Sequence, residues 1–202
     1  IEFPSERRDA IPELSKYYES NVPGVYVVGS LAGYPLIKQA MNQGYDVVEF
    51  ISGNFVKPAD YPLLQYQLSA LPYDREVEDL LSRFQDLIPM FRELNSLGFR
   101  ELVIESNIIA SYPAGAVFND AKKSIDDLSK KLASEGRNPR VTKVVQQGST
   151  IYEPGEFGTS FYTIVDGEVI LESEYEGQSI KSTLERGEFF GESSLLSGRP
   201  RS

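Results

Sequence analysis

Glycines punctuate the last third of the chain at short, nearly regular intervals, and this spacing limits the folds open to it. Eight of the sixteen glycines lie within residues 148–198, mostly about ten residues apart. Such spacing is typical of short antiparallel strands. The dipeptide Asp166-Gly167 supplies the positive φ angles of a tight turn, which predicts a hairpin between residues 161–165 and 169–171. We therefore expect a barrel or a sandwich in this part of the chain.

Residues 22–50 carry a different pattern, in which a short apolar run, a glycine turn and a helical repeat follow one another. The run Val-Tyr-Val-Val at residues 25–28 is typical of a buried parallel strand. Beyond Gly33, apolar residues recur at helical spacing, and we expect this helix to end at Gly44. The pattern predicts a strand, a turn and a helix, which could be part of a dinucleotide-binding unit or a plain βα unit of the core, since the strict G-x-G-x-x-G spacing is absent.

The middle of the chain falls into three parts. Residues 54–75 hold three prolines and no sustained period, so we predict a linker that partly packs. From Val77 to Ile88 the apolar residues follow a helical period, which predicts an amphipathic helix that Pro89 ends or kinks. Residues 119–140 are strongly charged around a thin apolar stripe, which predicts a surface helix.

The charge balance bears on the choice of partner. Thirty acidic residues against twenty basic ones give a formal charge of −10, the opposite of what a protein needs to hold a nucleic-acid backbone. We therefore expect no nucleic-acid partner. A small anion is not excluded, because one arginine and a few backbone amides can hold a phosphate. The acidic clusters at residues 76–79 and 126–127 are expected to be solvated helix faces.

Histidine and cysteine are both absent, which removes much of the common catalytic chemistry. Disulfides, Cys/His zinc sites, cysteine nucleophiles and Ser-His-Asp triads are excluded. We expect no metal site and no catalytic residue in this chain. The lack of cysteine fits a reducing cytoplasm, which is the location that we expect. The sequence contains no run of about 18 apolar residues, so we expect no membrane partner.

The strongest candidate for a ligand site lies at residues 187–202, with the sequence GEFFGESSLLSGRPRS. Gly191 and Glu192 precede small and apolar residues that can open a one-turn helix, whose first amides would point outward as in backbone anion sites. Arg201 adds a planar, permanently charged fork for a phosphate. Glu192 would repel a phosphate, so we expect it to accept a hydrogen bond from a neutral hydroxyl, such as that of a sugar.

This stretch resembles the phosphate-binding cassette of the cyclic-nucleotide-binding domain, a family that includes catabolite activator proteins, regulatory subunits of cyclic-nucleotide-dependent kinases and gated channels. The matching residues are Phe190, Gly191, Glu192, Leu195, Leu196, Ser197, Gly198, Pro200, Arg201 and Ser202. The resemblance extends over about residues 85–202. It implies an antiparallel, jelly-roll-like β-barrel with flanking helices.

The resemblance also implies a role for each residue of the motif. Arg201 would contact the cyclic phosphate, and Glu192 would accept a hydrogen bond from the ribose 2′-hydroxyl. The amides of Ser193 and Ser194 would be further phosphate donors. Phe190 is the first of the predicted ligand-binding residues. Gly191 would let the backbone approach the ligand, and Ser202 would touch phosphate or base. The ligand would be cAMP or cGMP, between which the sequence does not distinguish.

A second resemblance lies in the sequence ESNVPGVYVVGSLAG at residues 19–33. It is similar to the final FAD-contacting segment of thioredoxin-reductase-like, pyridine-nucleotide flavoproteins, in which a Val-Pro-Gly turn leads into a strand, a glycine and a helix that faces the flavin. The resemblance implies that Gly29, Ser30 and Gly33 approach FAD, and that Lys38 faces its phosphates or solvent. Ser30 stands where these flavoproteins usually carry Asp.

We therefore predict an α+β chain with three parts. Residues 1–53 would be a partial, FAD/NAD(P)-binding Rossmann-like segment, and residues 54–75 a linker. Residues 76–202 would be a cyclic-nucleotide-binding domain, with an insertion at about 119–144 and without its C-terminal lid helix. We expect the chain to be a segment of a longer, FAD/NAD(P)-dependent oxidoreductase that this domain regulates when it binds its small-molecule ligand. Homodimer formation is left open.

Two alternative hypotheses remain. In the first, oxidoreduction with FAD and NAD(P)H is the main activity, and the barrel is an inert appendage. In the second, the barrel is a ligand-free interaction or dimerisation module, because a domain can keep its fold after losing its ligand.

Overall fold

The computed structural model describes residues 1–2, 11–33, 37–54, 57–71, 73, 75–94, 96–175 and 178–201. The chain forms two compact units. Unit 1 comprises Ile1–Leu81 and Glu93–Gln147, and unit 2 comprises Ser82–Arg92 and Gly148–Ser202. The domain boundaries drawn from the sequence stay predictions.

Residues 25–28 in unit 1 do not form the predicted buried parallel strand. Tyr26 makes a single antiparallel bridge with Glu19, across a tight turn. The two outer valines of the run are each 37% exposed. A strand needs a neighbour along its length, and the turn supplies one bridge only. The Rossmann-like segment predicted for residues 1–53 is therefore not supported.

The helix that follows is longer than predicted. A 3-10 turn, η1 (Gly29–Ala32), comes first, and α1 (Ile37–Ile51) then continues through Gly44. The predicted helix end at Gly44 is wrong. A glycine inside a helix costs only about 1 kcal/mol, and the apolar repeat carries on beyond this one.

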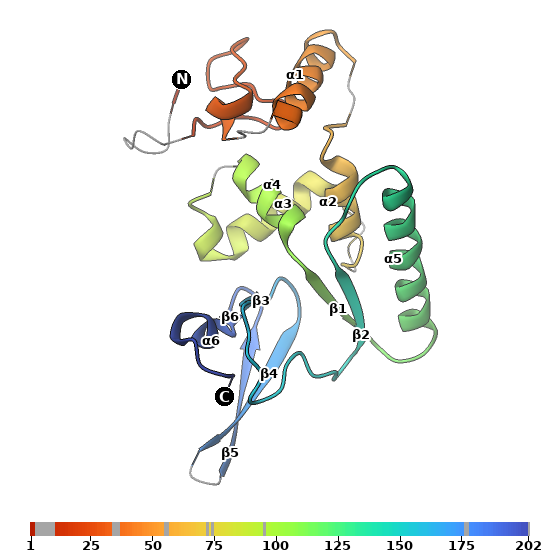
Figure 1. Cartoon of the computed structure of the whole chain (residues 1–202), viewed down its shortest axis with the longest axis vertical. Coiled ribbons are helices and arrows are strands. Elements are labelled where there is room, and N and C mark those ends of the chain that lie inside the picture. The colour runs from red at the N-terminus through yellow and green to blue at the C-terminus, as the bar shows by residue number, and fades with distance from the viewer. Residues whose placement is uncertain are drawn as a thin grey trace. The chain divides into compact units, whose positions relative to one another are not determined.

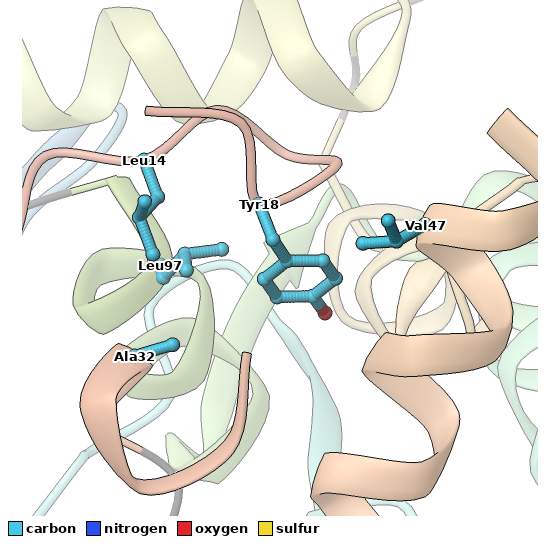
Figure 2. Packing of buried hydrophobic residues seen from close by; sticks show 5 residues of the cluster. All are labelled: Leu14, Tyr18, Ala32, Val47 and Leu97. Carbon is cyan, nitrogen blue, oxygen red and sulfur yellow. The ribbon is translucent and has the colours of Figure 1, made fainter. Parts of the chain in front are cut away.

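A buried apolar cluster joins these N-terminal elements to α4 (Ser96–Glu105). Figure 2 shows the Tyr18 ring between Leu97 of α4 and Val47 of α1, with Leu14 and Ala32 on either side of Leu97. Burial of each large apolar side chain in such a cluster contributes about 1.5–3 kcal/mol to stability. The cluster therefore holds the N-terminal segment in place, although the described residues of that segment form no sheet.

The predicted linker at residues 54–75 contains a helix, α2 (Tyr61–Leu68). Pro62 lies in its first turn, where a missing N–H leaves no helical hydrogen bond unmade, so this proline favours the helix start. Leu64 and Gln67 are fully buried. The Gln67 amide donates to two backbone carbonyls at the end of α4, at 3.1 and 2.7 Å. The helix is thus part of the core of unit 1.

The predicted amphipathic helix is confirmed as α3 (Val77–Leu87), and the 3-10 turn η2 (Pro89–Phe91) follows where Pro89 was expected to end it. The boundary between the two units falls within α3. The apolar face of the helix is buried at Val77, Leu80, Leu81 and Phe84, and Ile88, just beyond its end, is buried too.

Unit 1 also contains a βαβ arrangement. β1 (Ile108–Tyr112) pairs in parallel with β2 (Thr142–Gln146), and α5 (Ala116–Ser134) makes the crossover that a parallel pair requires. In Figure 1, α5 runs alongside both strands. The surface helix predicted within residues 119–140 is confirmed. Ile125 and Leu132 of this helix are buried against the sheet and α2, and the rest of it is largely exposed.

Unit 2 carries two antiparallel strand pairs. β3 (Tyr162–Thr163) pairs with β6 (Phe189–Phe190), and β4 (Glu168–Tyr175) pairs with β5 (Gln178–Glu185). A short helix, α6 (Glu192–Ser197), follows β6. The antiparallel strands predicted for this region are confirmed. The described residues show no closed barrel, and their strands form these two pairs.

The hairpin predicted between residues 161–165 and 169–171 is wrong in its pairing. Gly167 does adopt a φ of 78°, as the turn requires. However, β4 pairs with β5 along the whole of its length, whereas β3 pairs with the distant β6. Each cross-strand pair adds a fraction of a kcal/mol, so the longer ladder outweighs the short one that the local turn offers.

Candidate functional site

Arg201 is buried in unit 2, with 6% of its surface exposed. Its guanidinium donates from Nη2 to the Ser160 carbonyl at 2.9 Å and from Nη1 to the Gly191 carbonyl at 3.4 Å. Its backbone is also fixed, because its N–H donates to the Glu156 carbonyl and its own carbonyl accepts from Gly155, both at 2.8 Å. The side chain is thus held at both ends.

Aromatic rings line one side of the Arg201 guanidinium. Its central carbon lies 4.0 Å from the centre of the Tyr152 ring and 5.5 Å from that of Tyr162. Tyr162 stacks on Phe190 at 5.0 Å, and Tyr152 lies 6.1 Å from each of them. The pairing of β3 with β6 places Tyr162 opposite Phe190. We call Tyr152, Tyr162 and Phe190 the aromatic row.

Two glycines leave the space that the guanidinium occupies. A Cβ on Gly158 would lie 2.1 Å from Nη2 of Arg201, and one on Gly191 would lie 2.6 Å from Nη1. Gly191 also has a φ of 81°, a conformation that side-chain-bearing residues rarely adopt. The backbone at Gly191 thus lies close to Arg201, whereas its predicted approach to a ligand stays a prediction.

The charge of Arg201 has no carboxylate partner within 4.0 Å among the described residues. Arg100 in unit 1 is the contrasting case. It is 3% exposed, and its guanidinium bonds to the carboxylates of Asp60 and Glu78 at 2.8–2.9 Å. Burial alone lowers the pKa of Arg100, and the two carboxylates more than offset this and raise it. A buried cation normally needs such a partner.

The predicted one-turn helix after Gly191 is confirmed as α6. Glu192 is half-buried in its first turn, Ser193 is exposed, and Ser194 is 7% exposed. The Ser193 hydroxyl donates to a Glu192 carboxylate oxygen at 3.1 Å. Gly191, which caps the start of α6, accepts from Arg201, so the helix start and the arginine adjoin each other. Ser202 lies outside the described residues.

Two of the four residues predicted to bind FAD or NAD(P), Gly29 and Gly33, have their backbone amides bonded within the chain. The Gly29 amide donates to Oε1 of Gln43 at 2.6 Å, and the Gly33 amide donates back to the carbonyls of Gly29 and Ser30. Lys38 is exposed on α1. The backbone donors at both glycines are thus bonded within the chain, and nothing here supports a dinucleotide site.

The sequence did not predict several of the residues that surround Arg201 and Arg100. Tyr152 and Gly158 carry no motif signal, because their contact with Arg201 depends on tertiary structure. The acidic cluster at residues 76–79 was expected to be solvated, yet Glu78 bonds to buried Arg100. The apolar spacing of α3 predicts which face of the helix is buried. It does not predict which residue the polar face, with Glu78, will contact.

Two kinds of feature are absent from the described part of the chain. No helix there is both long and apolar enough to cross a membrane. No group of three or more metal-ligating side chains there could hold a metal ion.

Parts of the chain are similar in sequence to known proteins. Residues 142–202 match the family model of the cyclic nucleotide-binding domain. A cAMP-dependent protein kinase regulatory subunit of Yarrowia lipolytica is 29% identical over 112 residues, which cover 54% of this chain. The chain spans 28% of the length of that relative. No solved structure matches the chain significantly. The last third of the chain is thus similar in sequence to a cyclic nucleotide-binding domain, and Arg201 lies within the matched region.

Proposed function

We propose that unit 2 binds a cyclic nucleotide, cAMP or cGMP, and that Arg201 contacts the cyclic phosphate. The observation that carries this proposal is a buried guanidinium without a carboxylate partner among the described residues. An anion that reaches this guanidinium would supply the missing charge, and arginine forms strong, charge-assisted bonds with phosphate oxygens. The family match over residues 142–202 supports a cyclic nucleotide as that anion.

The residues of α6 would complete the site. Ser193 and Ser194 lie in the first turn, where backbone amides have no partner within the helix. Their amides would donate to the phosphate, beside the charge of Arg201. An ionised Glu192 carries hydrogen-bond acceptors and no donor, so it would accept from the ribose 2′-hydroxyl rather than contact the phosphate. Ser202 would touch phosphate or base, as the sequence resemblance implies.

The bound nucleotide would act as a regulatory signal, as the name of the kinase regulatory subunit suggests for that relative. Regulation requires that the nucleotide bind one conformation more tightly than another. The proposal does not extend to an attached oxidoreductase, because the amides of Gly29 and Gly33 are already bonded within the chain. A homodimer stays a prediction, which sedimentation of the chain with and without nucleotide would test.

Calorimetric titration of the 202-residue chain with cAMP and with cGMP tests the proposal. We expect saturable binding of at least one nucleotide. Arg201→Ala should weaken it by about 10-fold or more, the loss typical of a bond to a charged group. Arg199→Ala removes an exposed arginine two residues away and should leave the affinity unchanged. No binding by the folded wild-type chain, or equal binding by Arg201→Ala, would contradict the proposal.

A further inference from the structure

We propose that Tyr152 is a positioning residue for Arg201, whose ring holds the guanidinium ready for an anionic ligand. The inference rests on the proposed function, since it names a residue that makes the same site work. Neither the sequence motif nor the family match assigns a role to Tyr152.

The geometry is that of a cation–π contact. The guanidinium carbon lies 4.0 Å from the centre of the Tyr152 ring, well inside the range of about 6 Å in which a ring attracts a cation. Tyr162 lies farther away, at 5.5 Å, so Tyr152 makes the closer contact. The two carbonyls of Ser160 and Gly191 bind the guanidinium through its terminal nitrogens.

The partners of Arg201 stabilise its charge without cancelling it. Ring faces and carbonyl oxygens are neutral groups, so the guanidinium keeps its full positive charge. Arg100, by contrast, is neutralised by two carboxylates, and an added anion would be repelled there. The choice of neutral partners therefore distinguishes an arginine that can bind a phosphate from one that only joins elements of the core.

Tyr152 is itself held by its neighbours in the aromatic row. Its ring lies 6.1 Å from both Tyr162 and Phe190, which stack on each other across the β3–β6 pair. Phe190 directly precedes Gly191, whose carbonyl accepts from Arg201. A short strand pair thus fixes both the ring and the carbonyl that position the arginine.

Titration of cAMP against Tyr152 variants of the full chain tests the inference. Tyr152→Leu removes the ring and should weaken binding by about 2- to 30-fold, the range of a cation–π contact. Tyr152→Phe keeps the ring and should bind like the wild type. If Tyr152→Leu does not fold, Tyr152→Met gives the same comparison with a longer side chain. Unchanged affinity without the ring, or equal weakening by Tyr152→Phe, would overturn the inference.

A second measurement does not depend on cyclic nucleotides. A proton above an aromatic ring resonates upfield, so the Arg201 Nε–H signal should be displaced upfield in the ligand-free wild type and in Tyr152→Phe. It should move to an ordinary position in Tyr152→Leu. If the wild type binds neither cAMP nor cGMP, the proposed function fails, and this signal still decides the positioning role. A signal that is the same in all three proteins would refute it.

Discussion

The guanidinium of Arg201 lies 4.0 Å above the ring of Tyr152, and no described carboxylate neutralises it. A buried ion costs several kcal/mol in lost hydration, and neutral partners recover only part of this. Arg201 is therefore a charge that the protein stabilises incompletely. An anionic ligand would supply the remaining stabilisation of this charge, which links the packing of unit 2 to its proposed activity.

Substitution of Gly158 by Ala should abolish most binding without unfolding the protein. The new Cβ would lie 2.1 Å from Nη2 and 2.3 Å from Cζ of Arg201, so the flexible end of the arginine must move away. We expect an affinity close to that of Arg201→Ala, measured by calorimetry, and a nearly unchanged melting temperature. Gly44→Ala, where a Cβ meets nothing within 4 Å, is the control and should bind normally. Full affinity in Gly158→Ala would refute the assigned position of Arg201.

Removal of the Glu192 carboxylate should matter only for a nucleotide that carries the ribose 2′-hydroxyl. Glu192→Ala should lose about 10-fold or more in affinity for cAMP, because it deletes a hydrogen bond to a charged acceptor. The same variant should lose little for 2′-deoxy-cAMP, since that ligand has no hydroxyl to donate. Titration of both ligands against both proteins forms a double-mutant cycle. Equal losses for the two ligands would rule out this contact.

Loss of Arg100 should destabilise unit 1. Arg100→Met leaves Asp60 and Glu78 beside each other without their cation, and we expect the free energy of unfolding to fall by about 2–3 kcal/mol. The value is below that of a fully buried pair because both carboxylates are partly exposed. Arg140→Met, which breaks an exposed pair with Glu105, should cost less than about 1 kcal/mol. Urea denaturation measures both, and equal costs would contradict a structural role for Arg100.

Asp46 makes the stability of the protein depend on pH. Burial raises its pKa, the Ala59 amide lowers it in part, and Asp60 raises it further. The folded state thus holds this proton more tightly than the unfolded state, so the ionised side chain lowers stability at pH 7. Asp46→Asn should be more stable than the wild type at pH 7. Its advantage should shrink as the pH falls through the raised pKa toward about 3.9. An advantage that grows on acidification would contradict this assignment.

The sequence predicted those parts of the fold that depend on local chemistry. The helical spacing and Pro89 predicted α3, and the small residues after Gly191 predicted α6. Proline carries two local signals in residues 54–75. The three prolines of this stretch predict a linker that partly packs, and Pro62 lies in the first turn of α2, a position that favours a helix.

Contacts between distant segments could not be predicted in the same way. Asp166-Gly167 indicated a local hairpin, but β3 pairs with β6, and that pairing builds the aromatic row. The same limit applies to the site. The motif predicts Arg201 as a site residue, whereas Tyr152 and Gly158 lie beside it only because the chain folds back on itself.

The most direct test of the proposed site is to follow the side-chain Nε–H signals of Arg201 and Arg100 by NMR while nucleotide is added to the full chain. With cAMP, the Arg201 signal should shift until the site is saturated, and adenosine, which lacks the phosphate, should not move it. Arg100 serves as an internal control. Its guanidinium is already bonded to the carboxylates of Asp60 and Glu78, so its signal should stay in place. An Arg201 signal that does not respond to saturating cAMP or cGMP would contradict the proposal that this arginine binds the cyclic phosphate.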